Sequence, residues 1–492
     1  MANQPLPNFN FKAIIVGGSV AGLTLAHMFE RANINYILLE ARDTISPSIG
    51  ASIVIMPNGS RILDQMGLYD VMKDEFMTGM KRTYTRRSDG RVVASNVWPA
   101  IVEERLKYIC GICERKIFLR SLYDQLRDKS KVKTGKRVSS IQHGENSVTA
   151  ICQDGSEYAG DIVIGADGIH SRTRQEMQRF AEETGPPGIM DRDKNSMTAQ
   201  YNCFFGISSP IPTLIPGESH TSSSIAHSAL LFVSEGSLPQ WSFFSKMPQR
   251  YIGAPNIPRF TKTDMQAQVE EFSDFHFAEH VTLKQLIDSS ETVSYFPLEE
   301  ANHENWTYGR FVCLGDAIHK MTPNMGQGGN QAIESGAVLT NCLLEMLTLN
   351  SNSSKGVRTS TGTKTAAHIS DIKASLDRYQ ALRQQRAKMV VGFSANLTRR
   401  DALDTLAYTL QFLFLPPSER FIADFSTELF RSAPCLNFLP QPSRIEDNEY
   451  WMENDTDLRS QQTKKPPVQE VKARFARPSA ASFDVTNQLG RL

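Results

Sequence analysis

The sequence predicts an α/β protein in which a domain built on buried strands and helices is interleaved with a second domain of antiparallel strands and ends in a helical C-terminal part. Three observations predict this class. A strand, a glycine turn, a helix and a second strand fill residues 12–40. Buried apolar strands that run directly into glycine recur at 161–164 and 308–314. Separated strand patterns with short helices between them occupy 176–300.

The first stretch, KAIIVGGSVAGLTLAHMFERANINYILLE, has the pattern of a dinucleotide site in a Rossmann-like fold. Gly17 permits the tight turn after the first strand, and Gly22 lets the helix pack closely on that strand. The helix N-terminus offers free N–H groups and a partial positive charge to a pyrophosphate. Glu40 ends the second strand, where a carboxylate can accept hydrogen bonds from a ribose. The middle position of G-x-G-x-x-G holds Ser19, which is small but weakens the match.

Changes of pattern divide the rest of the chain. Residues from about 80 to 100 predict a β-hairpin with Ser88-Asp89-Gly90 as its turn. A charged amphipathic helix opens with Arg115, and alternating strands of a β-meander lead to the buried strand at 161–164. A strand at 308–314 runs through a glycine-rich loop into a long helix. The predicted segments are 1–175 for the first part of the nucleotide-binding domain, 176–300 for the antiparallel domain, 301–400 for the second part of the nucleotide-binding domain, 401–451 for a helical region and 452–492 for a disordered tail.

The composition excludes several classes of protein. Lys plus Arg and Asp plus Glu both number 53, and no basic cluster with interleaved aromatic residues occurs, so we expect no nucleic-acid partner. The first ten residues lack a secretory signal, which indicates a cytoplasmic protein. The 7 cysteines form no framework and are expected to be free thiols. Cys110 and Cys113 have metal-ligand spacing, but no second pair or histidine set completes it, so we predict no metal site.

The region 406–442 leaves two alternatives open. It is apolar, but Pro416-Pro417 and several charges interrupt it, so no run of about 18 apolar residues supports a membrane span. Its helices either pack on the main body or touch a membrane surface peripherally.

Three motifs in order, GGSVAG…E at 17–40, GADG at 165–168 and GDAIHKMTPNMGQGGNQAIE at 315–334, resemble those of FAD-dependent monooxygenases with a single FAD fold. The resemblance covers about residues 11–400 and is closest to fungal epoxidases that act on meroterpenoids, indole diterpenes and related polyenes. It implies a Rossmann-like FAD-binding domain of the p-hydroxybenzoate hydroxylase (PHBH) type, interleaved with a β-sheet substrate domain.

The resemblance also implies roles for individual residues. Asp316 would accept hydrogen bonds from the ribityl hydroxyls of FAD, and Arg115 would lie over its phosphates. Asp167, with Gly168 and Arg172, matches a motif associated with both FAD and the pyridine nucleotide. The predicted FAD-binding residues are Gly17, Gly22, Glu40, Val54, Arg115, Asp167, Asp316 and Gly329, with Val54 and Gly329 acting through their backbone.

By the same resemblance, NAD(P)H reduces FAD, and O2 then supplies an electrophilic oxygen to a hydrophobic small molecule. Epoxidation of an alkene needs no base on the substrate, which agrees with the lack of a recognisable catalytic dyad. The catalytic residue stays open: His227 is a candidate acid, although a strand residue with no such role explains it as well. The alternatives are an aromatic-ring hydroxylase of the same class and a non-catalytic protein that binds prenyl chains.

Overall fold

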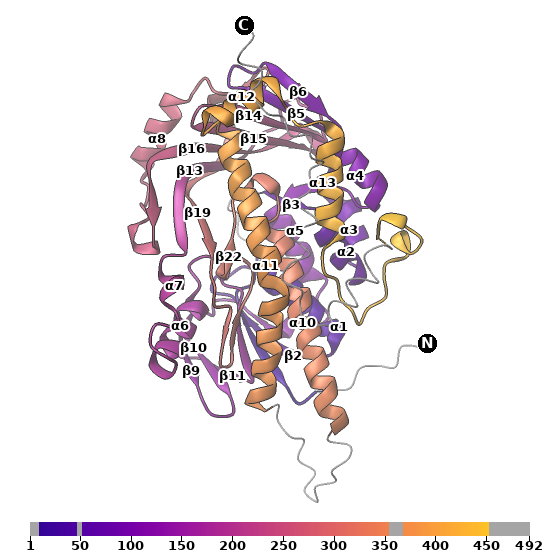
Figure 1. Ribbon diagram of the computed structural model, residues 1–492, viewed down its shortest axis with the longest axis vertical. Coiled ribbons are helices and arrows are strands. Elements are labelled where there is room, and N and C mark those ends of the chain that lie inside the picture. Colours follow the sequence, from indigo (N-terminus) through magenta and orange to yellow (C-terminus); the bar gives the residue numbers. More distant parts are fainter. Residues whose placement is uncertain (1–8, 47–51, 354–367, 452–492) are drawn as a thin grey trace, which may run out of the picture.

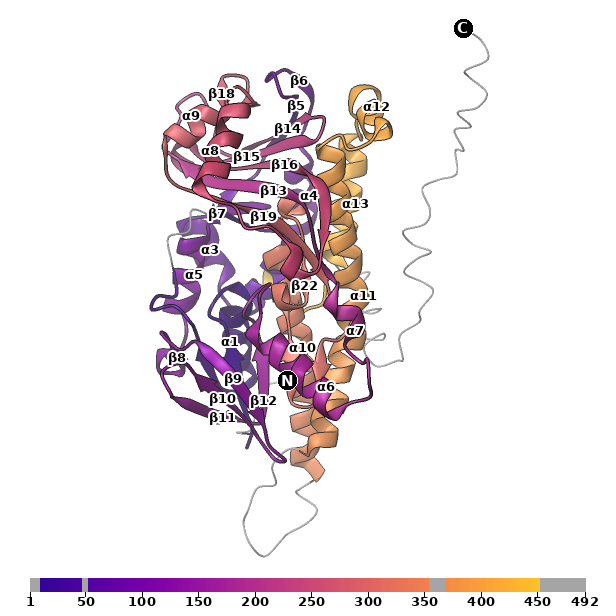
Figure 2. The same cartoon turned by 90° about the vertical axis from the view of Figure 1, so that its left-hand side faces the viewer.

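A computed structural model describes residues 9–46, 52–353 and 368–451. Figures 1 and 2 show a lower domain with a helix-covered sheet, an upper domain with a second sheet, and two long helices that run beside both. The predicted disordered tail, 452–492, lies outside the described residues. This arrangement confirms the predicted class, an α/β protein with two interleaved domains and a helical C-terminal part.

The lower domain contains a sheet of 6 strands in the order β20-β21-β12-β1-β2-β8. Its neighbouring strands run parallel except at the edge pair β20 and β21. The central strands are short runs of buried apolar residues, as expected where both faces of a parallel sheet are covered. The strands are β1 (Lys12–Val16), β2 (Asn35–Leu39), β8 (Val132–Lys133), β12 (Ile162–Gly165), β20 (Thr307–Tyr308) and β21 (Phe311–Cys313).

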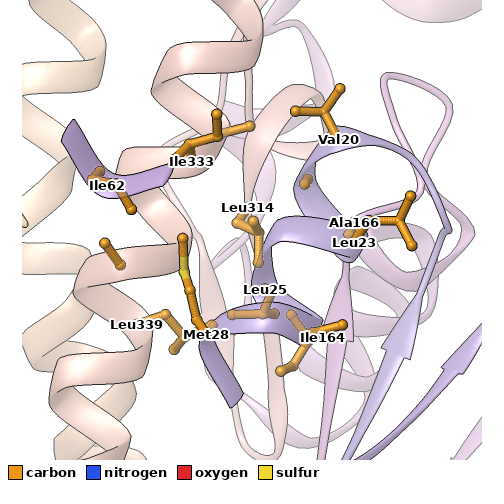
Figure 3. Packing of buried hydrophobic residues seen from close by; sticks show 14 of the residues in the cluster. Val20, Leu23, Leu25, Met28, Ile62, Ile164, Ala166, Leu314, Ile333 and Leu339 are labelled. Carbon is orange, nitrogen blue, oxygen red and sulfur yellow. The ribbon is translucent and has the colours of Figure 1, made fainter. Parts of the chain in front are cut away.

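Three helices build the core beside this sheet. Helix α1 (Val20–Ala32) packs against α10 (Gly328–Ser353), and α10 packs along α11 (Ile369–Asp401) (Figure 1). Figure 3 shows Leu25 and Met28 of α1 in one apolar cluster with residues of β12 and α10. By length and composition alone, the stretch Gly328–Ser351 could cross a membrane, but 78% of its apolar window is buried inside the protein. Helix α10 is therefore a core helix here.

A buried ion cluster joins α10, α11 and α2 (Pro57–Gln65). The carboxylate of Glu334 accepts hydrogen bonds from Arg383 at 2.9 Å, Arg386 at 2.7 Å and the Asn58 amide at 2.7 Å. Burial alone would raise the pKa of Glu334, but the two guanidinium groups outweigh it and lower that pKa to about 2. A charge buried this deeply is tolerated because every partner is in place.

The upper domain is a sheet of 8 strands in the order β22-β19-β13-β16-β15-β14-β5-β6. It is antiparallel except where β14 runs parallel to β5. The strands are β5 (Arg82–Arg87), β6 (Val92–Asn96), β13 (Met197–Ser208), β14 (Glu218–Ser224), β15 (His227–Ser234), β16 (Leu238–Ile252), β19 (Ser290–Asn302) and β22 (His319–Lys320).

Strands β5, β6 and β22 lie outside the interval 176–300 that the sequence assigned to this domain. The hairpin near 80–100 forms as expected, but it pairs with β14 instead of staying with the nucleotide-binding domain. We therefore keep 176–300 as a proposal for the continuous part of the upper domain and add the hairpin to it. The parallel pairing of β5 with a strand 130 or more residues later leaves no local sequence signal.

Smaller elements complete the two domains. Two three-stranded sheets form from β3 (Ser52–Ile55), β4 (Thr78–Gly79) and β7 (Gly111–Glu114), and from β9 (Val138–His143), β10 (Val148–Cys152) and β11 (Glu157–Gly160). A two-stranded pair joins β17 (His276–Ala278) and β18 (Val281–Thr282). The other helices before the C-terminal region are α3 (Tyr69–Glu75), α4 (Trp98–Leu106), α5 (Arg115–Asp124), α6 (Arg172–Thr184), α7 (Asp191–Lys194), α8 (Lys262–Glu271) and α9 (Leu283–Asp288).

The C-terminal region contains two helices with different surroundings. Helix α13 (Glu419–Arg431) packs against α4 and α2, and the buried indole of Trp451 lies 4.6 Å from the Arg61 guanidinium. Helix α12 (Leu406–Phe414) has no buried residue and projects from the body in Figure 2. Of the two alternatives left open for residues 406–442, packing of the helices on the main body therefore describes α13 but not α12.

We expect Gly22→Ala to lower the free energy of unfolding by about 1–3 kcal/mol, because a methyl group there would lie 1.9 Å from the Gly17 carbonyl oxygen. Gly392 is the matched control: it is also helical, but a methyl group there meets nothing within 4 Å. Gly392→Ala should raise stability by about 0.5–1 kcal/mol. Urea denaturation followed by circular dichroism measures both. Equal effects of the two variants would contradict the close packing of α1 on the β1 turn.

Candidate functional site

The register of the parallel sheet brings the sequence motifs to one edge. Val16 at the end of β1 lies opposite both Leu39 of β2 and Gly165 of β12, and Gly165 lies opposite Cys313 of β21. Residues that directly follow parallel strands ending in register lie side by side. The predicted residues that follow these strand ends are Gly17, Glu40, Asp167 and Asp316.

The turn after β1 requires glycine at two of the predicted positions. Gly17 has φ +108°, and a methyl group there would lie 2.4 Å from the Ala166 carbonyl oxygen. At Gly22 a methyl group would meet the Gly17 carbonyl oxygen. The backbones of β1, α1 and the loop after β12 therefore approach more closely than any side chain allows.

Ser19, the departure from the glycine pattern, causes no strain. Its φ of −98° and ψ of −161° are extended backbone, which any residue adopts. It precedes α1 without capping the helix through its side chain. Instead its hydroxyl oxygen accepts a hydrogen bond from the Arg115 guanidinium at 2.7 Å. The first N–H groups of α1 are thus left to a ligand, and a cation lies next to them.

The Glu40 carboxylate accepts hydrogen bonds from the protein's own backbone, which the sequence did not predict. One carboxylate oxygen accepts the Gly18 backbone N–H at 2.7 Å, and the other accepts the Arg42 backbone N–H at 2.9 Å. The side chain is buried, with 7% of its surface exposed. Glu40 therefore fixes the glycine turn as well as facing the cavity described next.

A cavity of about 290 Å³ lies between the two domains. On the lower side the glycine turn, Glu40 and Arg115 line it, and on the upper side Ile207 of β13 and Thr292 of β19 line it. Helix N–H groups and a guanidinium suit a pyrophosphate, and a carboxylate suits a ribose. The residues present therefore fit the adenosine diphosphate half of a dinucleotide cofactor.

Asp316 lies in the short 3₁₀ turn η4 (Gly315–Ala317), directly after β21. Its Oδ2 accepts a hydrogen bond from the Lys320 ammonium at 2.6 Å, and 35% of its side chain is exposed. Burial alone would raise the pKa of this carboxyl, but Lys320, with smaller effects from His319 and Arg115, lowers it below its ordinary value. Asp316 is therefore ionised at neutral pH and is positioned to accept hydrogen bonds from hydroxyl groups.

Asn330, which the sequence did not single out, holds together the segments that contain Val54 and Gly329. Its side-chain amide donates to the carbonyl oxygens of Val54 at 2.9 Å and Gly326 at 2.7 Å, and its oxygen accepts the Met56 N–H at 3.0 Å. Gly329 lies in the first turn of α10, where a methyl group would come within 3.0 Å of Ile53. An asparagine inside a helical pattern gives no sequence signal for such a long-range role.

Asp167 turns inward. Its carboxylate accepts hydrogen bonds from the Ser171 hydroxyl at 2.5 Å and the Thr173 N–H at 2.9 Å, which fixes the start of α6. Arg172 pairs with Glu176 at 2.6 Å in the same helix. Arg174 donates to the carbonyl oxygen of Ala317 and so ties this turn to the Asp316 loop. The contacts of Asp167 therefore belong to the turn, and its role toward FAD stays a prediction.

Two histidines, His227 and His319, are not among the residues that line the cavity. On β15, His227 lies on the same face as Ala229 and Leu231, which belong to an apolar cluster, and its ring lies 4.3 Å from that of Phe272. Burial lowers its pKa, so the ring is neutral at pH 7. His319 is fully buried, its Nε2 lies 2.9 Å from the Ser335 hydroxyl, and its pKa is lowered to about 4. Neither geometry supports proton transfer to a substrate in the cleft.

The face of the upper sheet that carries Ile207 combines an aromatic and apolar patch with small polar side chains, since Ser242 and Ser294 lie opposite Phe205 and Gln240 lies opposite Ile207. Phe205 stacks on Phe296 with ring centroids 5.4 Å apart and contacts Phe244 edge-on at 6.3 Å. Tyr201, Cys203, Leu230 and Leu298 form the buried cluster beside these rings. Because Ile207 lines the cavity next to Ser19 and Arg115, this face looks toward the lower domain.

The described residues contain no group of three or more His, Cys, Asp or Glu that could hold a metal ion. The 7 cysteines are free and buried, and burial raises the pKa of the Cys110 and Cys113 thiols. Both cysteines therefore behave as small apolar core residues.

Comparison with known proteins identifies the nucleotide. A model of the FAD binding domain matches residues 10–355. The FAD-dependent monooxygenase andE of Emericella variicolor is 37% identical over 438 residues, which are 88% of this chain and 89% of andE. The FAD-dependent monooxygenase prhF of Penicillium brasilianum is 39% identical, over 88% of each chain.

Solved structures agree in fold. Klebsiella pneumoniae HpxO, complexed with FAD and uric acid, matches 88% of this chain and 100% of its own with a TM-score of 0.67 and 22% identity. A substrate complex of salicylate hydroxylase matches 93% of this chain and 99% of its own with a TM-score of 0.60 and 20% identity. The chain belongs to the family of FAD-dependent monooxygenases, and FAD is its cofactor.

Proposed function

We propose that this monooxygenase uses NAD(P)H and O2 to epoxidise an alkene of a prenylated or polyene secondary metabolite in a fungal biosynthetic pathway. One observation carries the proposal: the sheet face toward the cofactor domain holds a patch of stacked phenylalanine rings and aliphatic side chains. Such a patch binds hydrocarbon by burial of apolar area.

The chain's own residues would bind the cofactor and exclude water. Bound FAD supplies electron transfer from the nicotinamide and oxygen transfer to the substrate. Gly17, Gly22, Glu40 and Arg115 would hold its adenosine diphosphate half. Asp316 would hold the ribityl chain, and the backbone near Val54 and Gly329 would face the flavin ring. For Asp167 we propose an indirect role through the turn that it fixes. The apolar sheet face would orient the alkene and keep water from the reacting oxygen.

An aromatic-ring hydroxylase is the second candidate, because a substrate complex of salicylate hydroxylase shares the fold. A phenolic substrate is activated by a base near its hydroxyl group. Tyr201 lies on the same sheet face, but burial, followed by the effect of Asp404, raises the pKa of its hydroxyl, so it stays protonated at neutral pH. Tyr201 therefore does not supply that base. A non-catalytic prenyl binder would have no need of the constrained glycines and the ionised Asp316.

Turnover assays separate the three candidates. The purified protein should contain flavin whose absorbance bleaches with NAD(P)H under anaerobic conditions. With a prenylated aromatic compound and O2, we expect a product that is one oxygen heavier, that has lost alkene protons in its NMR spectrum, and that forms in proportion to the NAD(P)H consumed. Coupled ring hydroxylation of salicylate would favour the second candidate instead. If NAD(P)H does not reduce the bound flavin, the non-catalytic prenyl binder would be the one candidate left.

We expect Asp316→Ala to lose at least about 10-fold in FAD affinity, since a charge-assisted hydrogen bond contributes about 1.5–3 kcal/mol. Flavin absorbance per protein and circular dichroism measure cofactor content and folding separately. Asp377→Ala is the control, because Asp377 is an exposed carboxylate that also pairs with a lysine four residues away. Full flavin content in Asp316→Ala would remove this residue from the FAD site.

We also propose that the enzyme works in the cytoplasm and contacts a membrane surface through α12. The helix contains no charged residue and none of its side chains is buried. Leu406 is 75% exposed and Phe414 72%, and beyond the helix Leu415 is 74% exposed and Phe421, in α13, 61% exposed. An exposed apolar helix is suited to the headgroup boundary of a bilayer.

Flotation with vesicles of phosphatidylcholine and phosphatidylserine tests this contact. The double variant Leu410→Asp, Phe414→Asp should bind at least about 10-fold more weakly, because two apolar side chains no longer enter the interface. The control is Leu349→Asp, since Leu349 is 60% exposed but lies near the far end of α10 (Figure 1). Vesicle binding that both variants retain, or an apolar surface buried in a homodimer by light scattering, would contradict the proposal.

A further inference from the structure

Asp316 and Lys320 form an ion pair that joins the two domains. Asp316 follows β21 of the lower sheet, and Lys320 belongs to β22, the edge strand of the upper sheet. The backbone of Lys320 pairs with Ala301 of β19. The ammonium and carboxylate are 2.6 Å apart and are only 29% and 35% exposed. This is a closer and better shielded pair than most of those on the protein surface.

Only one oxygen of the Asp316 carboxylate takes part in this pair. Lys320 donates to Oδ2, and among the described residues no hydrogen bond to Oδ1 is found. Because about a third of the side chain is exposed, a ligand can reach the carboxylate. The ion pair thus fixes the direction of the carboxylate and leaves its other acceptor available.

Two other charged or titratable groups approach Asp316. Arg115, on α5, acts on it from a greater distance and directs its guanidinium to the Ser19 hydroxyl. His319 is adjacent in sequence, but its ring faces Ser335 and its lowered pKa of about 4 leaves it neutral at pH 7. Lys320 is therefore the cation in direct contact with this carboxylate.

We propose that Lys320 is a positioning residue for FAD, which holds the Asp316 carboxylate ionised and oriented so that Oδ1 accepts hydrogen bonds from the cofactor's ribityl hydroxyls. The inference rests on the proposed role of Asp316. It also makes the affinity for FAD depend on the position of β22, because the same lysine is part of the upper sheet.

Removal of the ammonium has a definite consequence for pH dependence. A cation within about 4 Å lowers a carboxyl pKa by about 1–3 units. The pKa of Asp316 should therefore rise when Lys320 is replaced by a neutral residue. A protonated carboxyl is a weaker acceptor than a carboxylate, so FAD affinity should fall as pH decreases through that raised pKa. In the native protein the same loss occurs only at lower pH.

The experiment measures the dissociation constant of FAD for apoprotein between pH 5 and 8 by quenching of flavin fluorescence. We expect Lys320→Met to bind FAD about 10-fold more weakly at pH 7 and to weaken further toward pH 5, over a range where the native protein changes little. Lys320→Arg should stay within about threefold of the native protein, because it retains the cation. Lys284→Met, which breaks an exposed pair of the same spacing at 2.9 Å, should change nothing.

Asp316→Asn separates the two assignments. It should bind FAD weakly and with no pH dependence in this range. If Asp316→Asn binds FAD like the native protein, the role of Asp316 is wrong. If Asp316→Asn is weak but Lys320→Met matches the native protein at every pH, the role of Lys320 is wrong. A lowered melting temperature of Lys320→Met with unchanged FAD affinity would likewise overturn the role of Lys320. If Lys320→Met does not fold, Lys320→Gln takes its place in the experiment.

Discussion

The register of four parallel strands is the constraint on which the rest of this site depends. Four parallel strands end at one level, at Val16, Leu39, Gly165 and Cys313. Four loops that are distant in sequence therefore meet at one edge of the sheet. The loops can meet only because Gly17 lacks a side chain against the Ala166 carbonyl group. A shift of one strand by a single residue would turn its side chains over and separate the loops.

Polar side chains then hold these loops to one another. Glu40 binds the amide of Gly18, Arg174 reaches from the turn after β12 to the carbonyl group of Ala317, and Asn330 joins β3 to the glycine-rich loop. Each of these contacts satisfies backbone groups that irregular segments would otherwise leave unpaired. Backbone fixed in this way is arranged before the cofactor arrives, so less order has to be gained on binding.

Sequence reasoning reached the fold class, the family and the position of the glycine turn, because these depend on local patterns of glycine and apolar residues. It could not find Asn330 or the partner of Ser19, since those contacts join residues 276 and 96 positions apart. The hairpin formed by β5 and β6 was predicted as a local unit, but its pairing with β14 depends on the whole upper sheet. Local patterns specify elements, whereas long-range packing decides which sheet receives them.

The cavity that we propose for the adenosine diphosphate half is lined by both domains, with Ser19 and Arg115 on one side and Ile207 and Thr292 on the other. A ligand that binds only this arrangement stabilises it by mass action, so FAD bound as proposed would bridge the sheets as well as act as a redox group. The ion pair of Asp316 with Lys320 links the two domains a second time, since Lys320 belongs to the upper sheet. With both links in place, the apolar patch around Phe205 and Phe296 is held toward the flavin domain, as the proposed oxygen transfer to a hydrocarbon requires.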